Sequence, residues 1–182
     1  MTKERFKKIN RFIYGLSNLW IVVSAIGLLF FSIFSIFPKL FDKINLNLSI
    51  ELPGISFILK EVSEINSYYF LILTLNILIF LLLGIFFRKI FKNIKDEKIF
   101  IKENFNYLKS IGLLTIASTI PYTMFNYNNA KIILENLKFH TSDFSLNIKL
   151  NFELVILGII IIIFAEIFKY AVELREENDL TI

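Results

Sequence analysis

Long apolar runs dominate the chain and predict helices that cross a membrane. Four runs are long enough to consider, and they cover residues 12–37, 68–87, 108–125 and 152–174. A helix needs about 20 mostly apolar residues to cross a hydrocarbon core of about 30 Å. The first run is too long for the apolar part of a signal peptide, so we expect it to be retained. The pattern predicts an α-helical integral membrane protein, a four-transmembrane-helix bundle that forms a single membrane domain over residues 1–182.

Small and polar residues interrupt the third run, which makes it the weakest of the four. Gly112, Thr115, Thr119 and Thr123 fall on one stripe of a helix there. Small and hydroxylated residues favour close contact between helices in lipid, so we expect this stripe to face another helix. The alternative is that the stripe lines a conduction path. Pro121 has no backbone N–H to donate to the carbonyl four residues earlier, which predicts a kink in this span.

Two segments outside the spans alternate apolar and polar residues with the period of a β-strand. Residues 43–52 lie in the outer connection 38–67, and residues 143–152 end the outer connection 126–151. Apolar residues within 55–65 and 133–137 recur at helical spacing. These patterns predict a small extracytoplasmic cap of two paired antiparallel strands, which would hold the first and fourth spans together, plus short helices. The alternative is two disordered loops whose alternation is accidental.

The connection over residues 88–107 is strongly basic and has the pattern of a helical hairpin. Ile90, Phe91 and Ile94 extend the second span with an apolar stripe, and a charged turn follows at residues 95–98. Candidate functional residues of this cytoplasmic hairpin are Phe100, Asn104, Leu108 and Lys109.

The distribution of positive charge predicts the orientation. Fourteen of the 20 Lys and Arg residues lie before residue 12, within 88–109, or at the C-terminal end. Cytoplasmic segments near membrane spans carry an excess of Lys and Arg. We therefore expect both termini in the cytoplasm and a partner in the anionic lipid of the bilayer, with no direct binding of nucleic acid.

Composition restricts the chemistry. The chain is 55% hydrophobic and holds 21 Phe, no Cys and one His. Disulfides, thiolate metal sites, Cys nucleophiles and centres with several His ligands are therefore excluded. No phosphate loop or local nucleophile–base pair is present in the sequence. We expect no enzymatic activity, no metal and no cofactor.

A few polar residues within the spans are candidate functional positions. Glu166 lies in the inner part of the fourth span, with Lys169 and Tyr170 three and four residues later on the same helix face. Asn76 lies in the middle of the second span. The functional interpretation of Glu166 is a site linked to protons or cations, and that of Asn76 is a position that lines a conduction path. The alternative is structural: a Glu166 anchor paired with Lys169, and an Asn76 that serves helix packing.

The cytoplasmic tail, residues 175–182, is charged and then ends on an apolar–polar–apolar sequence. It is a candidate for binding a partner protein by strand addition. The alternative is that Leu180 and Ile182 fold back onto the hairpin around Phe100 and Phe105. The candidate residues of the tail are Glu177, Asn178, Asp179, Leu180, Thr181 and Ile182.

Two segments resemble a known family. The chain ends Glu-Asn-Asp-Leu-Thr-Ile, and residues 100–111 read Phe-Ile-Lys-Glu-Asn-Phe-Asn-Tyr-Leu-Lys-Ser-Ile. Both are similar to segments of the bacterial membrane family named domain of unknown function 2975, although Ile101 stands where that family often has a capping Ser or Thr. The resemblance implies a four-helix protein of the cytoplasmic membrane, without known activity. Members of the family are often encoded beside a small helix-turn-helix regulator.

The predicted function is therefore that of a non-enzymatic interaction or regulatory protein, linked to envelope stress or antimicrobial response. Its expected partners are a small cytosolic DNA-binding regulator or another membrane protein. The alternative is a small transporter or channel subunit that works as a homo-oligomer.

Overall fold

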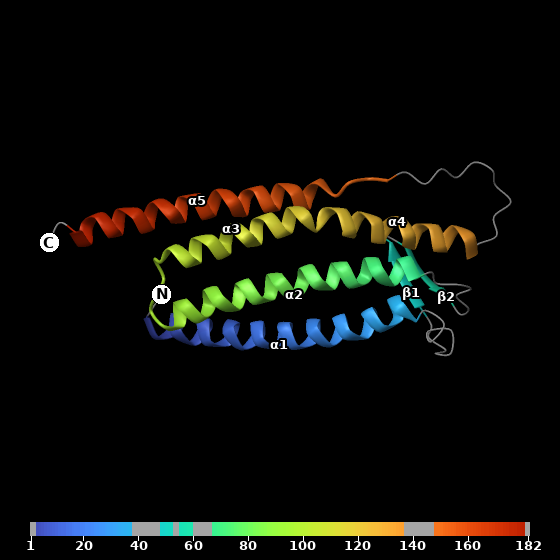
Figure 1. Ribbon diagram of the computed structural model, residues 1–182, viewed down its shortest axis with the longest axis horizontal. Coiled ribbons are helices and arrows are strands. Elements are labelled where there is room, and N and C mark those ends of the chain that lie inside the picture. Colours follow the sequence, from blue (N-terminus) through green and yellow to red (C-terminus); the bar gives the residue numbers. More distant parts are fainter. Residues whose placement is uncertain (1–2, 38–47, 53–54, 60–66, 137–147, 181–182) are drawn as a thin grey trace. The chain divides into compact units, whose positions relative to one another are not determined.

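The computed structural model is mainly helical and describes residues 3–37, 48–52, 55–59, 67–136 and 148–180. Its elements are, in chain order, α1 (Lys3–Ile36), β1 (Leu48–Leu52), β2 (Ile55–Leu59), α2 (Ser67–Lys95), α3 (Lys102–Ala117), α4 (Thr119–Asn136) and α5 (Phe152–Leu180) (Figure 1).

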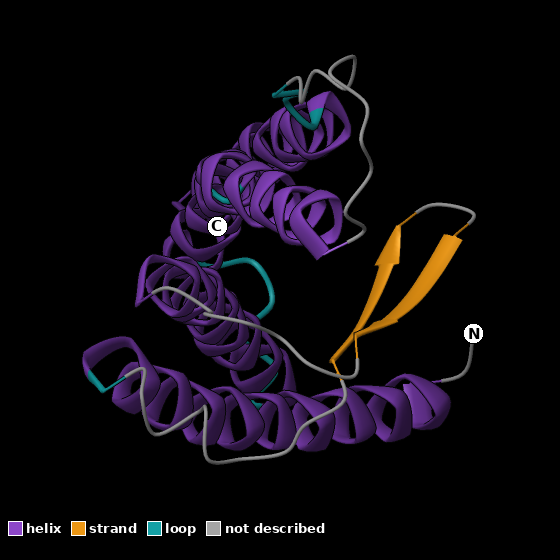
Figure 2. Ribbon diagram, turned by 90° about the vertical axis from the view of Figure 1, so that its right-hand side faces the viewer, coloured by secondary structure: helices purple, strands orange, loops and turns teal. Residues whose placement is uncertain are grey.

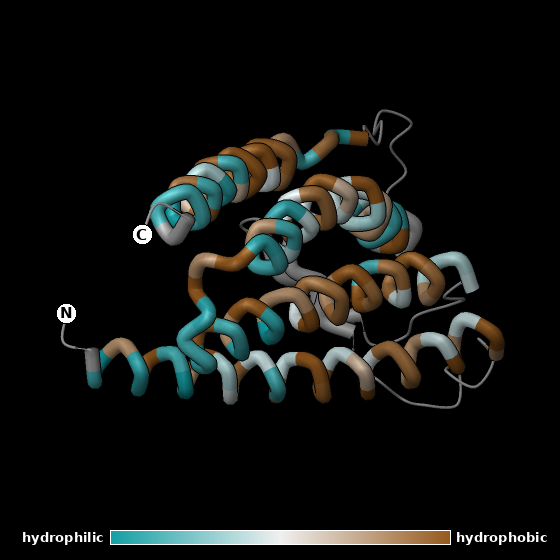
Figure 3. Tube along the Cα trace, turned by 60° about the vertical axis from the view of Figure 1, so that its left-hand side comes forward, coloured by the Kyte–Doolittle hydropathy of each residue, from teal (hydrophilic) through white to brown (hydrophobic). Residues whose placement is uncertain are grey.

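Three helices in the described part of the chain are long and apolar enough to cross a membrane. They are α1, α2 and α5, over Glu4–Ile36, Ser67–Lys95 and Phe152–Asn178. A helix rises about 1.5 Å per residue, so each is longer than a hydrocarbon core of about 30 Å. Figure 3 shows hydrophilic residues gathered at the N-terminal end of α1, with hydrophobic residues further along. The first, second and fourth apolar runs therefore lie in helices with the properties of membrane spans.

The third predicted span, residues 108–125, is divided between α3 and α4 and is not among these three helices. The interruption falls at Ser118, three residues before Pro121, as the missing proline donor predicts. The Ser118 N–H still donates to the Leu114 carbonyl at 2.8 Å, and its hydroxyl donates to the Thr115 carbonyl at 2.6 Å. The local hydroxyl thus satisfies a carbonyl beside the break.

The predicted strand pairing is wrong. β1 lies within the predicted strand 43–52, but its antiparallel partner is β2, which pairs Leu48 with Leu59 and Leu52 with Ile55. Figure 2 shows β1 and β2 as two neighbouring strands of a hairpin. The helix expected within 55–65 is instead a strand over Ile55–Leu59. Residues 148–151 are not in a strand, and residues 143–147 lie outside the described residues. Pairing two strands across a two-residue connection costs less conformational entropy than pairing two strands that are 90 residues apart in the sequence.

Two compact units divide the chain. Unit 1 comprises Met1–Ile26, Leu78–Thr119 and Asn151–Ile182, and unit 2 comprises Gly27–Ile77 and Ile120–Leu150.

In unit 1, α1 packs on α2 through aromatic rings. The Trp20 ring lies 5.7 Å from that of Phe80 and 5.9 Å from that of Phe87, between ring centroids. A Cβ at Gly84 would lie 3.3 Å from Cδ1 of Trp20, so this glycine leaves room for the indole. α3 packs on α5 in the same unit, and Ile111 and Ala165 are almost fully buried there.

In unit 2, the core gathers around α1 and the N-terminal half of α2. Phe34 and Phe70 are buried, with 5.6 Å between their ring centroids. The Tyr69 hydroxyl donates to Asn129 Oδ1 of α4 at 3.0 Å, and both residues are buried. A polar pair thus fixes α4 against α2 inside an otherwise apolar core.

Candidate functional site

Glu166 forms an ion pair between two helices of unit 1. Lys109 Nζ on α3 lies 3.1 Å from Glu166 Oε1 on α5, and the two side chains are 45% and 42% exposed. The predicted pairing of Glu166 with Lys169 is wrong, because Lys169 lies 3.6 Å from Glu173, one turn further along α5. The packing of α3 on α5 brings in a partner 57 positions away in the sequence. Pairing with Lys109 lowers the cost of a carboxylate in a helix that is long and apolar enough to cross a membrane.

A contact between two glycines lies close to this ion pair. A Cβ at Gly112 of α3 would lie 2.9 Å from the Gly158 carbonyl oxygen, and one at Gly158 of α5 would lie 2.7 Å from the Gly112 carbonyl oxygen. The backbones therefore approach as closely as a glycine pair allows. The ion pair joins Lys109 to Glu166, and the glycine contact joins Gly112 to Gly158. A higher residue number on α3 thus faces a lower one on α5, so the two helices are antiparallel.

The predicted small-residue stripe on the third run is buried. Thr115, Thr119 and Thr123 are 7%, 3% and 6% exposed, and Gly112 is buried as well. The Thr115 hydroxyl donates to the carbonyl of Ile111 in its own helix. The packing interpretation of this stripe is therefore the one the structure favours.

Asn76, the candidate in the second span, connects two helices of unit 2. Its Nδ2 donates to the Ile72 carbonyl at 3.0 Å and to the Pro121 carbonyl of α4 at 3.1 Å. The amide nitrogen is thus occupied by backbone oxygens, an arrangement that serves helix packing.

The hairpin between α2 and α3 forms as predicted, and Asn104 organises it. Asn104 is 4% exposed and accepts a 2.8 Å hydrogen bond from Asn93 Nδ2 of α2. Its own Nδ2 donates to the carbonyls of Lys98 and Ile99, at 3.0 and 2.8 Å. Ile101 stands at the N-cap of α3 and provides no side-chain cap. Asn104 therefore connects α2 to the turn before α3 through both ends of its side-chain amide.

Phe100, Leu108 and Tyr170, the other hairpin and α5 candidates, take no part in the Lys109–Glu166 pair. Phe100 stacks on Phe168 of α5, with 5.5 Å between ring centroids. Leu108 is half-buried, whereas Tyr170 is 67% exposed. Lys109 is the hairpin candidate that the structure joins to Glu166.

The tail candidates continue the last helix. α5 ends at Leu180, beyond the expected end of the span at residue 174, and Glu177 and Asn178 are exposed. Asp179 and Leu180 belong to this helix, and Thr181 and Ile182 lie outside the described residues. Whether the tail folds back onto Phe100 and Phe105 stays a prediction.

Asn10, near the N-terminal end of α1, is a buried polar residue that sequence reasoning did not single out. Asn10 is 5% exposed, and its Nδ2 donates to the Phe91 carbonyl of α2 at 3.2 Å. Its Oδ1 has no hydrogen-bond partner. An asparagine two residues before a long apolar run is the signal that would have found it. Among the described residues, no group of three or more His, Cys, Asp or Glu side chains could hold a metal ion.

No curated protein and no solved structure matches the chain. One family does match, over residues 17–182, and its description is "Protein of unknown function (DUF2975)". The match begins in the first apolar helix and includes the hairpin, the Lys109–Glu166 pair and the whole of α5. Because it covers most of the 182 residues, the chain belongs to the DUF2975 family.

Proposed function

We propose that this protein crosses the bacterial cytoplasmic membrane four times, with both termini in the cytoplasm. The uneven distribution of Lys and Arg supports this orientation. In unit 1, the N-terminal end of α1 and the C-terminal end of α2 lie together, because Lys7 Nζ is 2.7 Å from Glu97 Oε1. These basic ends of two helices fit the cytoplasmic side.

The packing of α3 and α4 supports a third, interrupted crossing. α3 lies antiparallel to α5 in unit 1, and α4 contacts the N-terminal part of α2 in unit 2. α5 and α2 are both long and apolar enough to cross a membrane. A segment that packs along such helices shares their environment, even though neither α3 nor α4 is a span by itself. A break at Ser118 is acceptable within a span where neighbouring groups satisfy the backbone.

The function that the geometry supports best is that of a non-enzymatic interaction protein that signals through its cytoplasmic face. The observation that carries this proposal is the end of α5, where the helix continues beyond the apolar run. Residues 173–178 are all exposed and include three glutamates and one arginine. An exposed acidic helical extension presents its charges at helical spacing to another protein.

The acidic charge of this extension favours a basic partner. A small DNA-binding regulator carries a basic surface that fits this description. Binding at the α5 extension would hold such a regulator at the membrane, away from DNA. A signal from envelope stress or an antimicrobial compound would then alter this binding.

The alternative, an oligomeric transporter or channel subunit, is less well supported by the polar contacts. The hydroxyls of Ser17, Ser32 and Thr74 all donate to carbonyls of their own helices, and Asn76 donates to two backbone oxygens. These groups are engaged in helix structure and do not form a polar path.

The experiment is co-purification from native membranes after crosslinking, with mass spectrometry of the bound proteins. The test variant is Glu176→Gln with Glu177→Gln, and the matched control is Asp96→Asn with Glu103→Gln. Both remove two exposed negative charges from the polar end of unit 1. We expect a small basic DNA-binding protein with wild type and control, and at least about tenfold less with the test variant. Equal recovery from both variants, or no such protein with the wild type, would contradict the proposal.

A further inference from the structure

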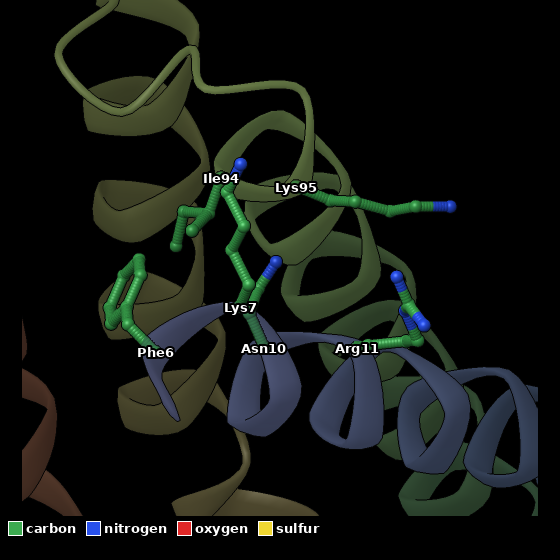
Figure 4. Close-up of a pocket in the computed structure, with 6 residues that line it drawn as sticks. All are labelled: Phe6, Lys7, Asn10, Arg11, Ile94 and Lys95. Carbon is green, nitrogen blue, oxygen red and sulfur yellow. The ribbon is translucent and has the colours of Figure 1, made fainter. Parts of the chain in front are cut away.

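A pocket lies between the N-terminal end of α1 and the C-terminal end of α2 in unit 1 (Figure 4). Its volume is about 190 Å³, many times what one water molecule requires. The residues that line it are Phe6, Lys7, Asn10, Arg11, Ile94 and Lys95. Three of the six are cationic and none is anionic. The pocket is therefore suited to an anion of several atoms.

The lining separates into an apolar part and a cationic part. Figure 4 shows Phe6 and Ile94 on one side of the pocket, and the basic groups of Arg11 and Lys95 extending on the other. The Lys95 ammonium lies 5.4 Å from the Tyr14 ring centroid, while Lys7 is paired with Glu97. Because Lys7 already pairs with a carboxylate, Arg11 and Lys95 are the pocket cations best placed to meet an anion. An amphipathic pocket of this kind matches a group that joins a phosphate to apolar atoms.

Asn10 adds a specific requirement to this pocket. Its side chain is 95% buried, and its Nδ2 is used by the Phe91 carbonyl. Its Oδ1 is a buried acceptor without a partner. A buried acceptor without a hydrogen bond costs about 1–3 kcal/mol. This oxygen is closed to solvent, so a ligand that donates a hydrogen reaches it only when the Asn10 side chain turns toward the pocket. Phosphate oxygens only accept at neutral pH, so the donor must be a second group of the ligand, such as a hydroxyl.

The position along the helices places the pocket at the level of lipid headgroups. Asn10 and Arg11 directly precede the apolar run that begins at Phe12, and Ile94 lies about two turns beyond Phe87, where the second run ends. Basic pockets between helices at this level are typical of sites for phosphorylated headgroups.

From these observations we propose that the pocket binds one anionic phospholipid whose phosphodiester headgroup carries a hydroxyl. Arg11 and Lys95 contact the phosphate, and Phe6 and Ile94 contact apolar atoms of the lipid. The Asn10 side chain turns toward the pocket on binding, and its Oδ1 accepts a hydrogen bond from the headgroup hydroxyl. This site is independent of the partner proposed for the end of α5.

The test is thermal unfolding of the full chain in a neutral detergent, titrated with four probes. The probes are phosphatidylglycerol, phosphatidylmethanol, phosphatidylcholine and inorganic phosphate. Phosphatidylmethanol has the same phosphodiester charge but no headgroup hydroxyl. We expect phosphatidylglycerol to raise the melting temperature the most, phosphatidylmethanol less, and the other two hardly at all. A rise with inorganic phosphate equal to that with phosphatidylglycerol would identify a free-phosphate site and overturn the lipid assignment. Equal rises with the two anionic lipids would overturn the assignment of a hydroxyl-bearing headgroup.

A pair of matched variants separates the pocket from the general positive charge of this face. Arg11→Gln with Lys95→Gln removes two pocket cations, and Lys8→Gln with Lys92→Gln removes two exposed cations of the same helices outside the pocket lining. We expect the pocket variant to bind phosphatidylglycerol about tenfold more weakly, and the control less than about threefold. Melting temperatures without lipid show that both variants fold, and single substitutions replace a double variant that does not. Equal weakening in both would show binding by the overall charge and overturn the proposal.

Discussion

The contact between Gly112 and Gly158 provides a sharp test of the packing of α3 on α5. Substitution Gly158→Ala would put its Cβ 2.7 Å from the Gly112 carbonyl oxygen, 3.1 Å from the Ile116 nitrogen and 2.5 Å from Ile116 Cγ1. The isoleucine side chain is able to rotate, but the two backbone atoms move only if the helices separate. An ordinary contact of at least 3.4 Å requires a separation of about 0.7 Å, which forfeits a quarter to a half of the dispersion energy of the atoms around it.

The expected cost of this separation is about 1–3 kcal/mol, the usual range for overpacking a well-packed site. Alanine is itself better than glycine in a helix by about 0.5–1 kcal/mol, which partly offsets that cost. Gly15→Ala is the matched control, because a Cβ at Gly15 of α1 has nothing within 4 Å. The control gains the helix preference without the clash, so the difference between the two variants isolates the steric cost.

The assay is reversible unfolding of each variant in mixed detergent micelles, titrated with sodium dodecyl sulfate and followed by circular dichroism. We expect Gly15→Ala to be at least as stable as the wild type. We expect Gly158→Ala to be about 1–3 kcal/mol less stable than Gly15→Ala. Equal stabilities for the two variants would refute the close approach of α3 and α5.

Three further substitutions test polar contacts in the same assay. Lys109→Met leaves Glu166 without its partner and should lower the free energy of unfolding by about 1 kcal/mol, because both side chains are nearly half exposed. The exchange Lys109→Glu with Glu166→Lys should recover at least half of this loss, and no recovery would argue against the pair. Asn104→Ala should cost about 1–3 kcal/mol, because it removes three hydrogen bonds of a buried side chain. Asn106→Ala, an exposed position on the same helix, should cost less than about 0.5 kcal/mol, and equal losses would contradict the organising role of Asn104. Tyr69→Phe should cost about 1–2 kcal/mol, because it removes the hydrogen bond to the buried Asn129 of α4. Tyr68→Phe, at the neighbouring exposed position, should be nearly neutral.

The sequence carries enough information for the helices and for the small-residue stripe. Long apolar runs and hydroxyl residues at helical spacing are recognised from residues that lie close together in the sequence. The burial of Gly112, Thr115, Thr119 and Thr123 confirms the pattern. The break at Ser118 was equally predictable from the sequence, because the missing N–H of a proline disturbs the helix that contains it.

Contacts between residues far apart in the sequence could not be predicted in the same way. Lys169 is near Glu166 in the sequence, but the side chain that reaches it belongs to Lys109 on another helix. Which helix faces which depends on the packing of backbones, and the close approach at Gly112 is visible only once Gly158 is known to oppose it. The strand at Ile55–Leu59 was missed because its apolar residues also fit helical spacing. The two-residue Pro-Gly connection before it was the better signal.

The central claim is that the chain crosses the membrane four times, with the interrupted α3–α4 segment as the third crossing. Because the chain has no Cys, single substitutions Lys131→Cys and Glu176→Cys, both at exposed positions, allow labelling of intact cells with a membrane-impermeant maleimide. Four crossings predict that position 131 is labelled from outside and that position 176 is labelled only after the membrane is permeabilised. Labelling of position 176 but not of position 131 in intact cells would show that only α1, α2 and α5 cross, and would contradict the account.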